Sequence, residues 1–262
     1  MARDRGDLKR AEELYRRAIA LRTKFLGVDN PETAWAMENL EGVLVELGKD
    51  NEAEELQIRV LGIREKILGR DAPETATSMN NIAVLLDRSA DPTSEERWDR
   101  RALAVRERVL GPDHPYTITT LANLGAALIR AGKPGEAEPL MRRSLETNEK
   151  LLGANSPQVA ADLNGLAGAL ANQGKRAEAE PFLRKAVAIY EASQPIDSPS
   201  LAQALVNLAT LRSEARDYAE AEVLLHHALT IREKVYGVGN ADTERVRSAL
   251  DAVIRARAAD GK

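Results

Sequence analysis

The sequence predicts an all-α repeat protein, because a short turn motif recurs along it at a constant interval. A glycine that follows a leucine is itself followed four residues later by a proline, as in Gly27 and Pro31. These glycines stand 42 residues apart up to Gly153, and the prolines do so from Pro31 to Pro199. A fixed period of about 20 to 50 residues is the signature of a solenoid or a repeat array.

The stretch between two turn motifs predicts a pair of helices. In one unit, apolar side chains recur at helical spacing at Met79, Ile82 and Leu86. A second break follows inside the unit, at sequences such as Gly-Lys-Pro beginning at Gly132. Each unit therefore holds a first helix after the proline and a second helix that ends at the next Leu-Gly.

The helices follow in order from this register. Residues 1–30 supply only a second helix and form a half repeat. Full repeats follow at 31–72, 73–114, 115–156, 157–198 and 199–240, and residues 241–262 form a C-terminal capping helix. The prediction is twelve helices in a single array over residues 1–262, without a sheet.

Residues suited to helix ends stand at the predicted boundaries. Proline fits the first helical position, which needs no N–H partner, and the glycine of each motif suits a left-handed C-cap. Side chains that are good N-caps precede several prolines or stand in their column: Asn30, Ser156, Ser198 and Asn240. The break before Trp98 is the least regular, and there Thr93 and Glu96 predict a capping box. Trp98 falls in a leucine column and is predicted to fill the core.

Composition excludes several classes of function. Net charge is −4 and no basic stripe stands out, which argues against nucleic acid as the main partner. The chain has no cysteine, so disulfides and thiolate chemistry are excluded. The charged N-terminus lacks the apolar core of a signal peptide, and no apolar run approaches the 18 residues of a membrane span. We therefore expect a soluble cytoplasmic protein that does not bind membranes.

The segment from Thr119 to Gly153 resembles the tetratricopeptide repeat, in the 42-residue variety found in kinesin light chains and many bacterial proteins. Small residues form the motif columns, as at Ala83 and Gly125 in first helices and at Ala137 in second helices. Small side chains let antiparallel helices approach closely. The resemblance covers essentially the whole chain and implies a right-handed superhelical solenoid. Abundant arginine and alanine with little lysine suggest a bacterial source.

The residues offer no catalytic set. His226 and His227 are adjacent on a predicted helix, so their side chains diverge by about 100° and cannot chelate one ion together. No glycine-rich phosphate loop follows a strand, because no strand is predicted. We expect no enzyme activity, no metal site and no cofactor.

The resemblance implies that the first helices line a concave groove that accepts extended peptides or a partner's helix. The candidate groove residues are Trp35, Asn39, Asn80, Asn81, Val84, Arg88, Asn123, Arg130, Asn164 and Asn207. A side-chain amide carries both donors and an acceptor, so a column of asparagines suits a peptide backbone, with Asn81 and Asn123 at its centre. The alternative is that these amides bond to the neighbouring repeat and only shape the superhelix.

Two classes of function remain. The first is an interaction scaffold or adaptor that binds a peptide segment of a partner protein in the groove. The second is the sensor or regulatory portion of a larger signalling ATPase or protease whose catalytic domain lies outside this chain. At the N-terminal end, Ala11, Tyr15 and Ala18 lack the first helix of their own unit, so we expect them to lie partly exposed. That end is predicted to be either a truncation point or a surface for self-association.

Overall fold

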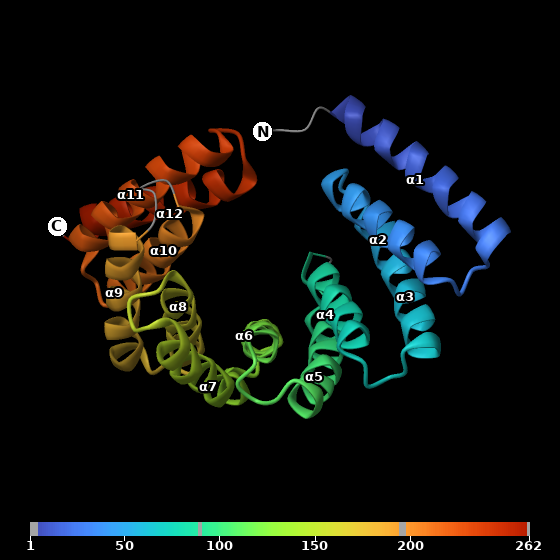
Figure 1. Cartoon of the computed structure of the whole chain (residues 1–262). Coiled ribbons are helices and arrows are strands. Elements are labelled where there is room, and N and C mark those ends of the chain that lie inside the picture. The colour runs from blue at the N-terminus through green and yellow to red at the C-terminus, as the bar shows by residue number, and fades with distance from the viewer. Residues whose placement is uncertain (1–4, 89–90, 194–197, 261–262) are drawn as a thin grey trace. The chain divides into compact units, whose positions relative to one another are not determined.

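The computed structural model is all-α (Figure 1) and describes residues 5–88, 91–193 and 198–260. These ranges hold twelve helices and no strand, which confirms the predicted fold class. The helices are α1 (Arg5–Leu26), α2 (Pro31–Glu46), α3 (Asp50–Ile67), α4 (Pro73–Arg88), α5 (Pro92–Val109), α6 (Pro115–Arg130), α7 (Pro134–Leu152), α8 (Pro157–Asn172), α9 (Arg176–Ser193), α10 (Pro199–Glu214), α11 (Tyr218–Tyr236) and α12 (Ala241–Asp260).

The chain forms two compact units. Unit 1 is Met1–Ala131 and contains α1 to α6, and unit 2 is Gly132–Lys262 and contains α7 to α12. The even-numbered helices are the first helices of the predicted repeats, and the odd-numbered helices are the second helices. That all repeats form one right-handed array stays a prediction.

The helices begin where the turn motif predicts. Asn30 caps α2 by accepting a hydrogen bond from the backbone N–H of Glu32 at 2.8 Å, and Ser156 caps α8 through the N–H of Val159 at 3.2 Å. The prediction for α5 was wrong, because Asp91 is its N-cap and accepts from the N–H of Ser94 at 3.1 Å. Because α5 begins at Pro92, Thr93 lies inside the helix and is not at its cap.

The turn motif contains a hydrogen bond that was not predicted from the sequence. The hydroxyls of Thr33, Thr75 and Thr117 donate to the carbonyl oxygens of Gly27, Gly69 and Gly111, at 2.8 to 2.9 Å. Each bond ties a first helix to the glycine that ends the preceding second helix. These glycines have φ near +90°, a left-handed backbone conformation that residues other than glycine rarely adopt.

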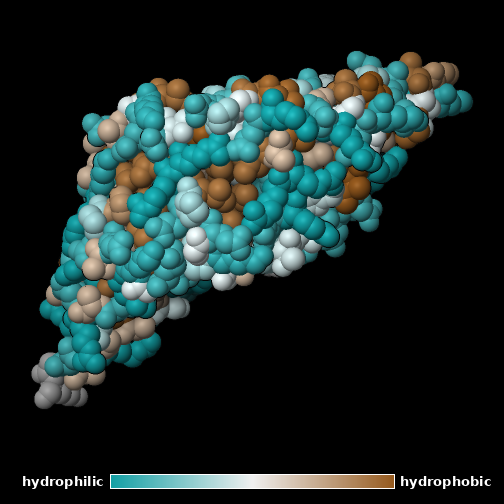
Figure 2. Space-filling model, turned by 90° about the horizontal axis from the view of Figure 1, so that it is seen from below, coloured by the Kyte–Doolittle hydropathy of each residue, from teal (hydrophilic) through white to brown (hydrophobic). Residues whose placement is uncertain are grey.

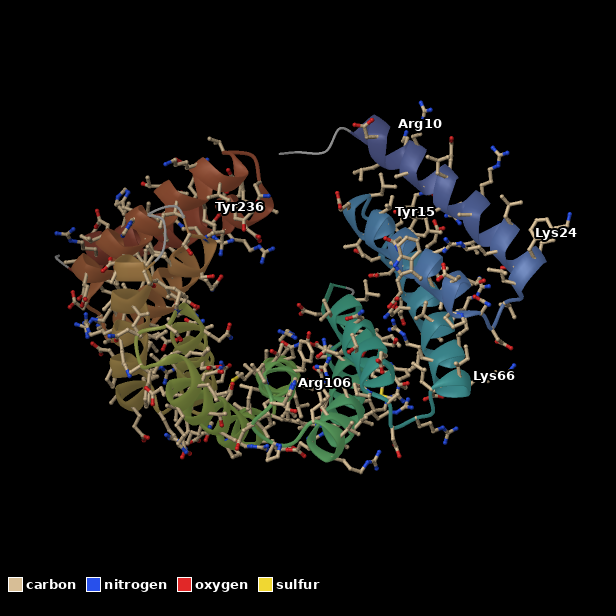
Figure 3. The ribbon with its side chains drawn as sticks, in the orientation of Figure 1. Arg10, Tyr15, Lys24, Lys66, Arg106 and Tyr236 are labelled. Carbon is tan, nitrogen blue, oxygen red and sulfur yellow. The ribbon has the colours of Figure 1, made fainter. Side chains whose placement is uncertain are left out.

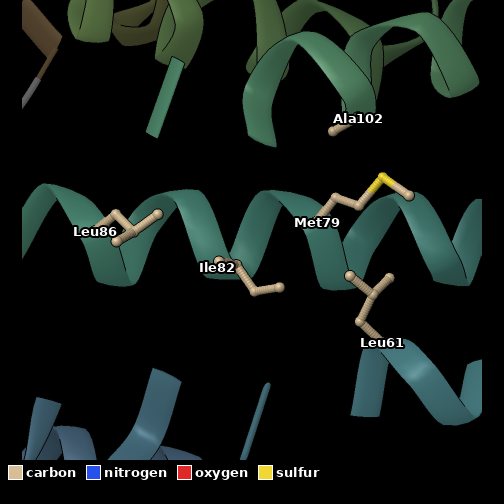
Figure 4. Close-up of a cluster of buried hydrophobic side chains, with 5 residues drawn as sticks. All are labelled: Leu61, Met79, Ile82, Leu86 and Ala102. Carbon is tan, nitrogen blue, oxygen red and sulfur yellow. The ribbon is translucent and has the colours of Figure 1, made fainter. Parts of the chain in front are cut away.

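Each unit buries its own apolar side chains between successive helices. In unit 1, Met79, Ile82 and Leu86 project from one side of α4 and meet Leu61 of α3 and Ala102 of α5 (Figure 4). Trp98 packs against this cluster, which confirms its predicted role in the core. In unit 2 the fully buried side chains include Leu163, Leu166, Leu170 and Leu183.

The outer surface is charged and rich in ion pairs between successive second helices. Arg101 of α5 pairs with Glu65 of α3 at 3.1 Å, and Lys185 of α9 pairs with Glu149 of α7 at 2.8 Å. On the face drawn in Figure 2, hydrophilic residues predominate and hydrophobic patches lie between them. In the described ranges, no helix has a stretch long and apolar enough to cross a membrane.

Candidate binding groove

A column of arginines joins each second helix of unit 1 to the first helix that follows. Arg22, Arg64 and Arg106 are 42 residues apart, and each Nη1 donates to a backbone carbonyl ten residues later. The distances are 2.6 Å to Glu32, 3.3 Å to Glu74 and 3.1 Å to Tyr116. This column was not predicted, although its 42-residue spacing is visible in the sequence. It fixes the positions of the first helices, whose faces carry the predicted groove residues.

Arg106 is the most buried member of this column, with 4% of its surface exposed. Its Nη1 also donates to Oδ1 of Asn80 at 3.0 Å, and its guanidinium lies 5.5 Å from the ring of Tyr116 (labelled Arg106 in Figure 3). Burial lowers the pKa of Arg106, and the nearby Asp99 carboxylate opposes that effect. Asn80 was predicted to face a ligand, but its side chain is buried and holds Arg106. This corrects its role to a structural one.

Buried acids lie beside Arg106 in the second helix α5. Asp99 is fully buried, and neither of its carboxylate oxygens has a hydrogen-bond partner. Burial and the neighbouring Glu95 raise the pKa of Asp99 to about 8. Glu95 accepts a hydrogen bond from Arg130 of α6 at 2.5 Å, and Arg130 also pairs with Asp87 at 3.1 Å. Arg130, a predicted groove residue, is therefore committed to two carboxylates of its own unit.

Within unit 1, some side-chain amides of the asparagine column make hydrogen bonds to described residues and others do not. The Nδ2 of Asn39 donates to the carbonyl oxygen of Trp35 in the same helix at 2.7 Å. Asn81 of α4 and Asn123 of α6 are half-buried, and neither side chain makes a hydrogen bond to any described residue. Two amides without hydrogen bonds to described residues thus occupy equivalent positions on α4 and α6, the two first helices that follow α2 in unit 1. Arg88 ends α4, and its side chain lies outside the described residues.

In unit 2 the asparagines bond to each other across repeats. Asn207 of α10 donates to Oδ1 of Asn164 of α8 at 2.9 Å and accepts from Gln203 at 3.0 Å. Arg232 of α11 then donates to Oε1 of Gln203 at 2.9 Å. Asn164 and Asn207 therefore fit the alternative in which the asparagines bond to the neighbouring repeat and do not face a ligand.

A hollow of about 770 Å³ lies between α8 and α10, above Leu183 of α9. Its polar side chains are largely occupied: Asn172 donates to the carbonyl of Gly168 at 2.9 Å, and Gln173 donates to Glu138 at 2.8 Å. Hydrogen bonds from Lys175, Arg142 and Gln173 lower the pKa of Glu138 to about 2. The hollow is large, but most of its amide N–H groups already donate hydrogen bonds within the protein.

A smaller and more apolar hollow of about 310 Å³ surrounds Trp35 in unit 1. The Trp35 side chain is 53% exposed, and the guanidinium of Arg22 lies 5.2 Å from its ring. Ile67 and Leu68 at the end of α3 are exposed on the wall of the same hollow. Val84 is likewise exposed on α4, so the unit that carries the free amides also carries exposed apolar side chains.

The described residues contain no group of three or more His, Cys, Asp or Glu placed to hold a metal ion. His226 is exposed on α11, and His227 beside it is half-buried. The polar side chains brought together on the first helices are amides, hydroxyls and paired ions, and such groups recognise other polar groups by hydrogen bonding.

Two family models of the tetratricopeptide repeat match the chain. One covers residues 1–65, 96–150 and 123–192, and the other covers 75–116 and 201–242. The chain belongs to the tetratricopeptide repeat family. No match was found among curated proteins.

Solved structures of several proteins have a similar fold. A Podosopora anserina protein with nearly identical TPR-like repeats of the kinesin light chain type is 24% identical, with a TM-score of 0.65, over 72% of this chain and 89% of that one. BtubC (BKLC) from P. vanneervenii is 22% identical, with a TM-score of 0.66, over 88% and 91%. A Rap protein complexed with Competence and Sporulation Factor is 14% identical, with a TM-score of 0.65, over 94% and 75%.

The tetratricopeptide repeat fold is typically a non-catalytic scaffold for protein interactions. In this tetratricopeptide protein, the predicted groove residues do not form one uniform row. Asn80, Asn164, Asn207 and Arg130 hold their own units together, whereas Asn81, Asn123, Trp35 and Val84 remain available on unit 1.

Proposed function

We propose that this protein is a non-catalytic scaffold that binds an extended peptide segment of another protein along the first helices of unit 1. The observation that carries the proposal is the pair of uncommitted amides, Asn81 and Asn123. An amide can donate to a peptide carbonyl and accept from a peptide N–H at once, so it recognises backbone without reading sequence.

Exposed apolar side chains on the same unit support the same proposal. Exposed Trp35 and Val84 supply area for ligand side chains, and aromatic anchors of this kind dominate many interfaces. Each amide contact contributes on the order of 1 kcal/mol net, so affinity requires both amides and the apolar hollow. A Rap protein whose structure is a complex with Competence and Sporulation Factor has a similar fold.

The test is selection of binders from a random peptide library, followed by titration against Asn81→Ala and Asn123→Ala. Each substitution is expected to weaken binding about fivefold, the equivalent of roughly 1 kcal/mol. Asn51→Ala, which removes an exposed amide from α3, is the matched control and leaves binding unchanged. Unchanged binding in both variants, or a fall in melting temperature that accounts for the loss, returns Asn81 and Asn123 to a structural role.

The second candidate function is the sensor or regulatory portion of a larger signalling ATPase or protease, and it uses the same binding face. An open reading frame that joins this chain to a catalytic domain distinguishes the two. The bacterial source, the cytoplasmic location and self-association through the N-terminal end stay predictions. The last of these concerns a different surface, the outer side of α1.

A further inference from the structure

The hollow around Trp35 in unit 1 combines apolar walls with charged side chains. Trp35 of α2 forms one wall, and Ile67 and Leu68 at the end of α3 are exposed on another. Its volume of about 310 Å³ is at the lower end of the usual range for ligand pockets, so it suits one long side chain. The charged residues that line it are Glu32, Glu38, Arg64 and Glu74.

Two of the three carboxylates of this hollow have a guanidinium partner, and the third has none. The Nη2 of Arg64 donates to Glu38 at 2.8 Å. Arg22, whose guanidinium lies over the indole ring, is 3.5 Å from a carboxylate oxygen of Glu32. Glu74 is exposed in the first turn of α4, and its carboxylate has no partner among the described residues. Around the hollow, the carboxylates thus outnumber the guanidiniums by one.

The repeat register shows that a carboxylate at this position can hold a cation. Glu32 and Asp242 occupy the same register position as Glu74, and their carboxylates lie 3.5 and 3.6 Å from the guanidinium of the arginine ten residues earlier. In the repeat of Glu74 the equivalent arginine, Arg64, donates to the backbone carbonyl of Glu74 and pairs its charge with Glu38 instead. The carboxylate of Glu74 is therefore left for a cation that the described part of the chain does not supply.

The chemistry of the hollow selects among the side chains that could fill it. A purely apolar side chain would take water from the Glu74 carboxylate without giving it a partner, which is unfavourable. An acidic side chain would meet a like charge. Lysine and arginine bury an aliphatic stem along apolar surface and carry a cation at its end. Such a stem fits against Ile67 and Leu68, and a cation is also attracted to an aromatic ring.

We propose that the hollow around Trp35 binds a lysine or arginine side chain of the bound peptide and pairs its cation with the carboxylate of Glu74. This inference rests on the proposed function, because the side chain belongs to a peptide held along the first helices of unit 1. It adds the class of peptide. Asn81 and Asn123 bind backbone without reading sequence, whereas the hollow selects a peptide with a basic residue.

The probes are fluorescent pools of short peptides that differ only in their fixed central residue, which is arginine, lysine, leucine or glutamate. The other positions are mixtures of alanine, serine, threonine and leucine, so the pools differ in one charge. Titration of the full chain is followed by fluorescence anisotropy. The arginine and lysine pools are expected to bind at least about threefold more tightly than the leucine pool and about tenfold more tightly than the glutamate pool.

Variants of Glu74 test whether its carboxylate causes the preference. Glu74→Gln is expected to remove the advantage of the basic pools over the leucine pool. Glu74→Lys is expected to reverse the order of the lysine and glutamate pools, because the charge in the hollow changes sign. Glu55→Lys makes the same charge change at an exposed position of α3 outside the hollow and keeps the preference for the basic pools. Circular dichroism checks that each variant is folded.

Asn81→Ala separates this inference from the proposed function, since it is expected to weaken all four pools equally, by about fivefold. If Asn81→Ala weakens the pools but the leucine pool binds as tightly as the basic pools, the inference is overturned and the proposed function stands. A preference that survives Glu74→Lys, or that Glu55→Lys removes equally, reflects the overall charge of the chain and also overturns the inference. Absence of saturable binding by every pool overturns the proposed function and the inference with it.

Discussion

Asp99 occupies a position that is apolar throughout unit 2. The residues of its column are Tyr15, Gln57, Asp99, Met141, Leu183 and Leu225. Gln57 and Asp99 are fully buried, and neither side chain has a hydrogen-bond partner for its polar atoms. Burial of a polar group without a partner costs free energy, so unit 1 carries a cost at this column that unit 2 does not.

Replacement of Asp99 by leucine is therefore expected to raise the stability of the protein and to flatten its pH dependence. The pKa of Asp99 rises from 3.8 to about 8 on folding. Below pH 3.8 the Asp99 carboxyl is protonated in both the folded and the unfolded state. Between pH 3.8 and about 8 it is protonated only in the folded state. Stability therefore falls as pH rises through this window, by at most about 1.4 kcal/mol per pH unit.

Urea denaturation of Asp99→Leu and wild type between pH 5 and 9 measures this effect. The difference in stability is expected to grow with pH and to level off above about pH 8. Asp251→Leu removes a carboxylate that is exposed on α12 and serves as the control, with no such trend. A variant less stable than wild type at pH 9 would show that the Asp99 carboxylate has a stabilising partner.

Arg106 is expected to contribute more to stability than the equivalent Arg22. Arg106→Met leaves Asn80 and Thr120 without their charged donor and removes the cation that offsets Asp99, at a cost of about 3 kcal/mol. Arg22→Met breaks a more exposed bond to Glu32 and is expected to cost less than about 1 kcal/mol. Equal losses in the two variants, measured by chemical denaturation, would contradict a special role for burial.

The sequence contained the arginine column but not its contacts. Arg22, Arg64, Arg106 and Arg232 share one register, which was readable from the 42-residue period. Whether each guanidinium meets a carbonyl, a ring or an amide depends on residues of two neighbouring helices, so spacing along the chain alone does not decide it. The same holds for Asn80, which is one residue before the free Asn81 and is buried.

Among the elements, the turns that end the second helices were predictable because their residues act locally. Gly153 ends α7 with φ of +83° and ψ of 151°, a conformation that requires glycine. Gly135 lies in the first turn of α7 with ordinary helical backbone, and a Cβ there would meet nothing within 4 Å. Two glycines of the same helix thus have different reasons to be present.

Gly153→Ala is expected to destabilise the protein by about 1 to 3 kcal/mol, because alanine is strained in this region of φ and ψ. Gly135→Ala is expected to be neutral or to stabilise by about 0.5 to 1 kcal/mol, since alanine restricts the unfolded chain and favours the helix. Thermal melting of both variants checks the pair. A tolerated Gly153→Ala would mean that the turn adopts another conformation.

The cap of α5 shows where local prediction fails. Asp91, Thr93 and Ser94 are all residues that favour helix starts, and the proline between them allows more than one boundary. The structure selects Asp91 because α5 begins at Pro92, directly after it. Boundaries shift by one or two residues when several good caps stand together, whereas the existence of the helix does not.

At the scale of the whole molecule, the two units share a fold but differ in what their first helices offer. In unit 2 the asparagine column is interrupted by Gly165, and Asn207 bonds to Asn164 beside it. In unit 1 Asn81 and Asn123 have no such neighbour. The sequence showed the column and its break at Gly165 but not which amides are bonded, because the partner of each amide lies about one repeat away and its orientation is set by packing.

Unit 2 is expected to fold when residues 132–262 are expressed alone, because repeat arrays are stabilised by contacts between neighbouring repeats. Its first two helices are joined by buried bonds: Ser144 of α7 donates to Asp162 of α8 at 2.8 Å, and Asn148 donates to the other oxygen at 2.6 Å. Circular dichroism is expected to show a helical spectrum with a cooperative melt. Asp162→Ala leaves two buried donors unpaired and should lower stability by about 2 to 4 kcal/mol, which shows that the fragment keeps native packing. A helical fragment that melts without cooperativity, or that tolerates Asp162→Ala, would mean that unit 2 needs residues 1–131 to form its core.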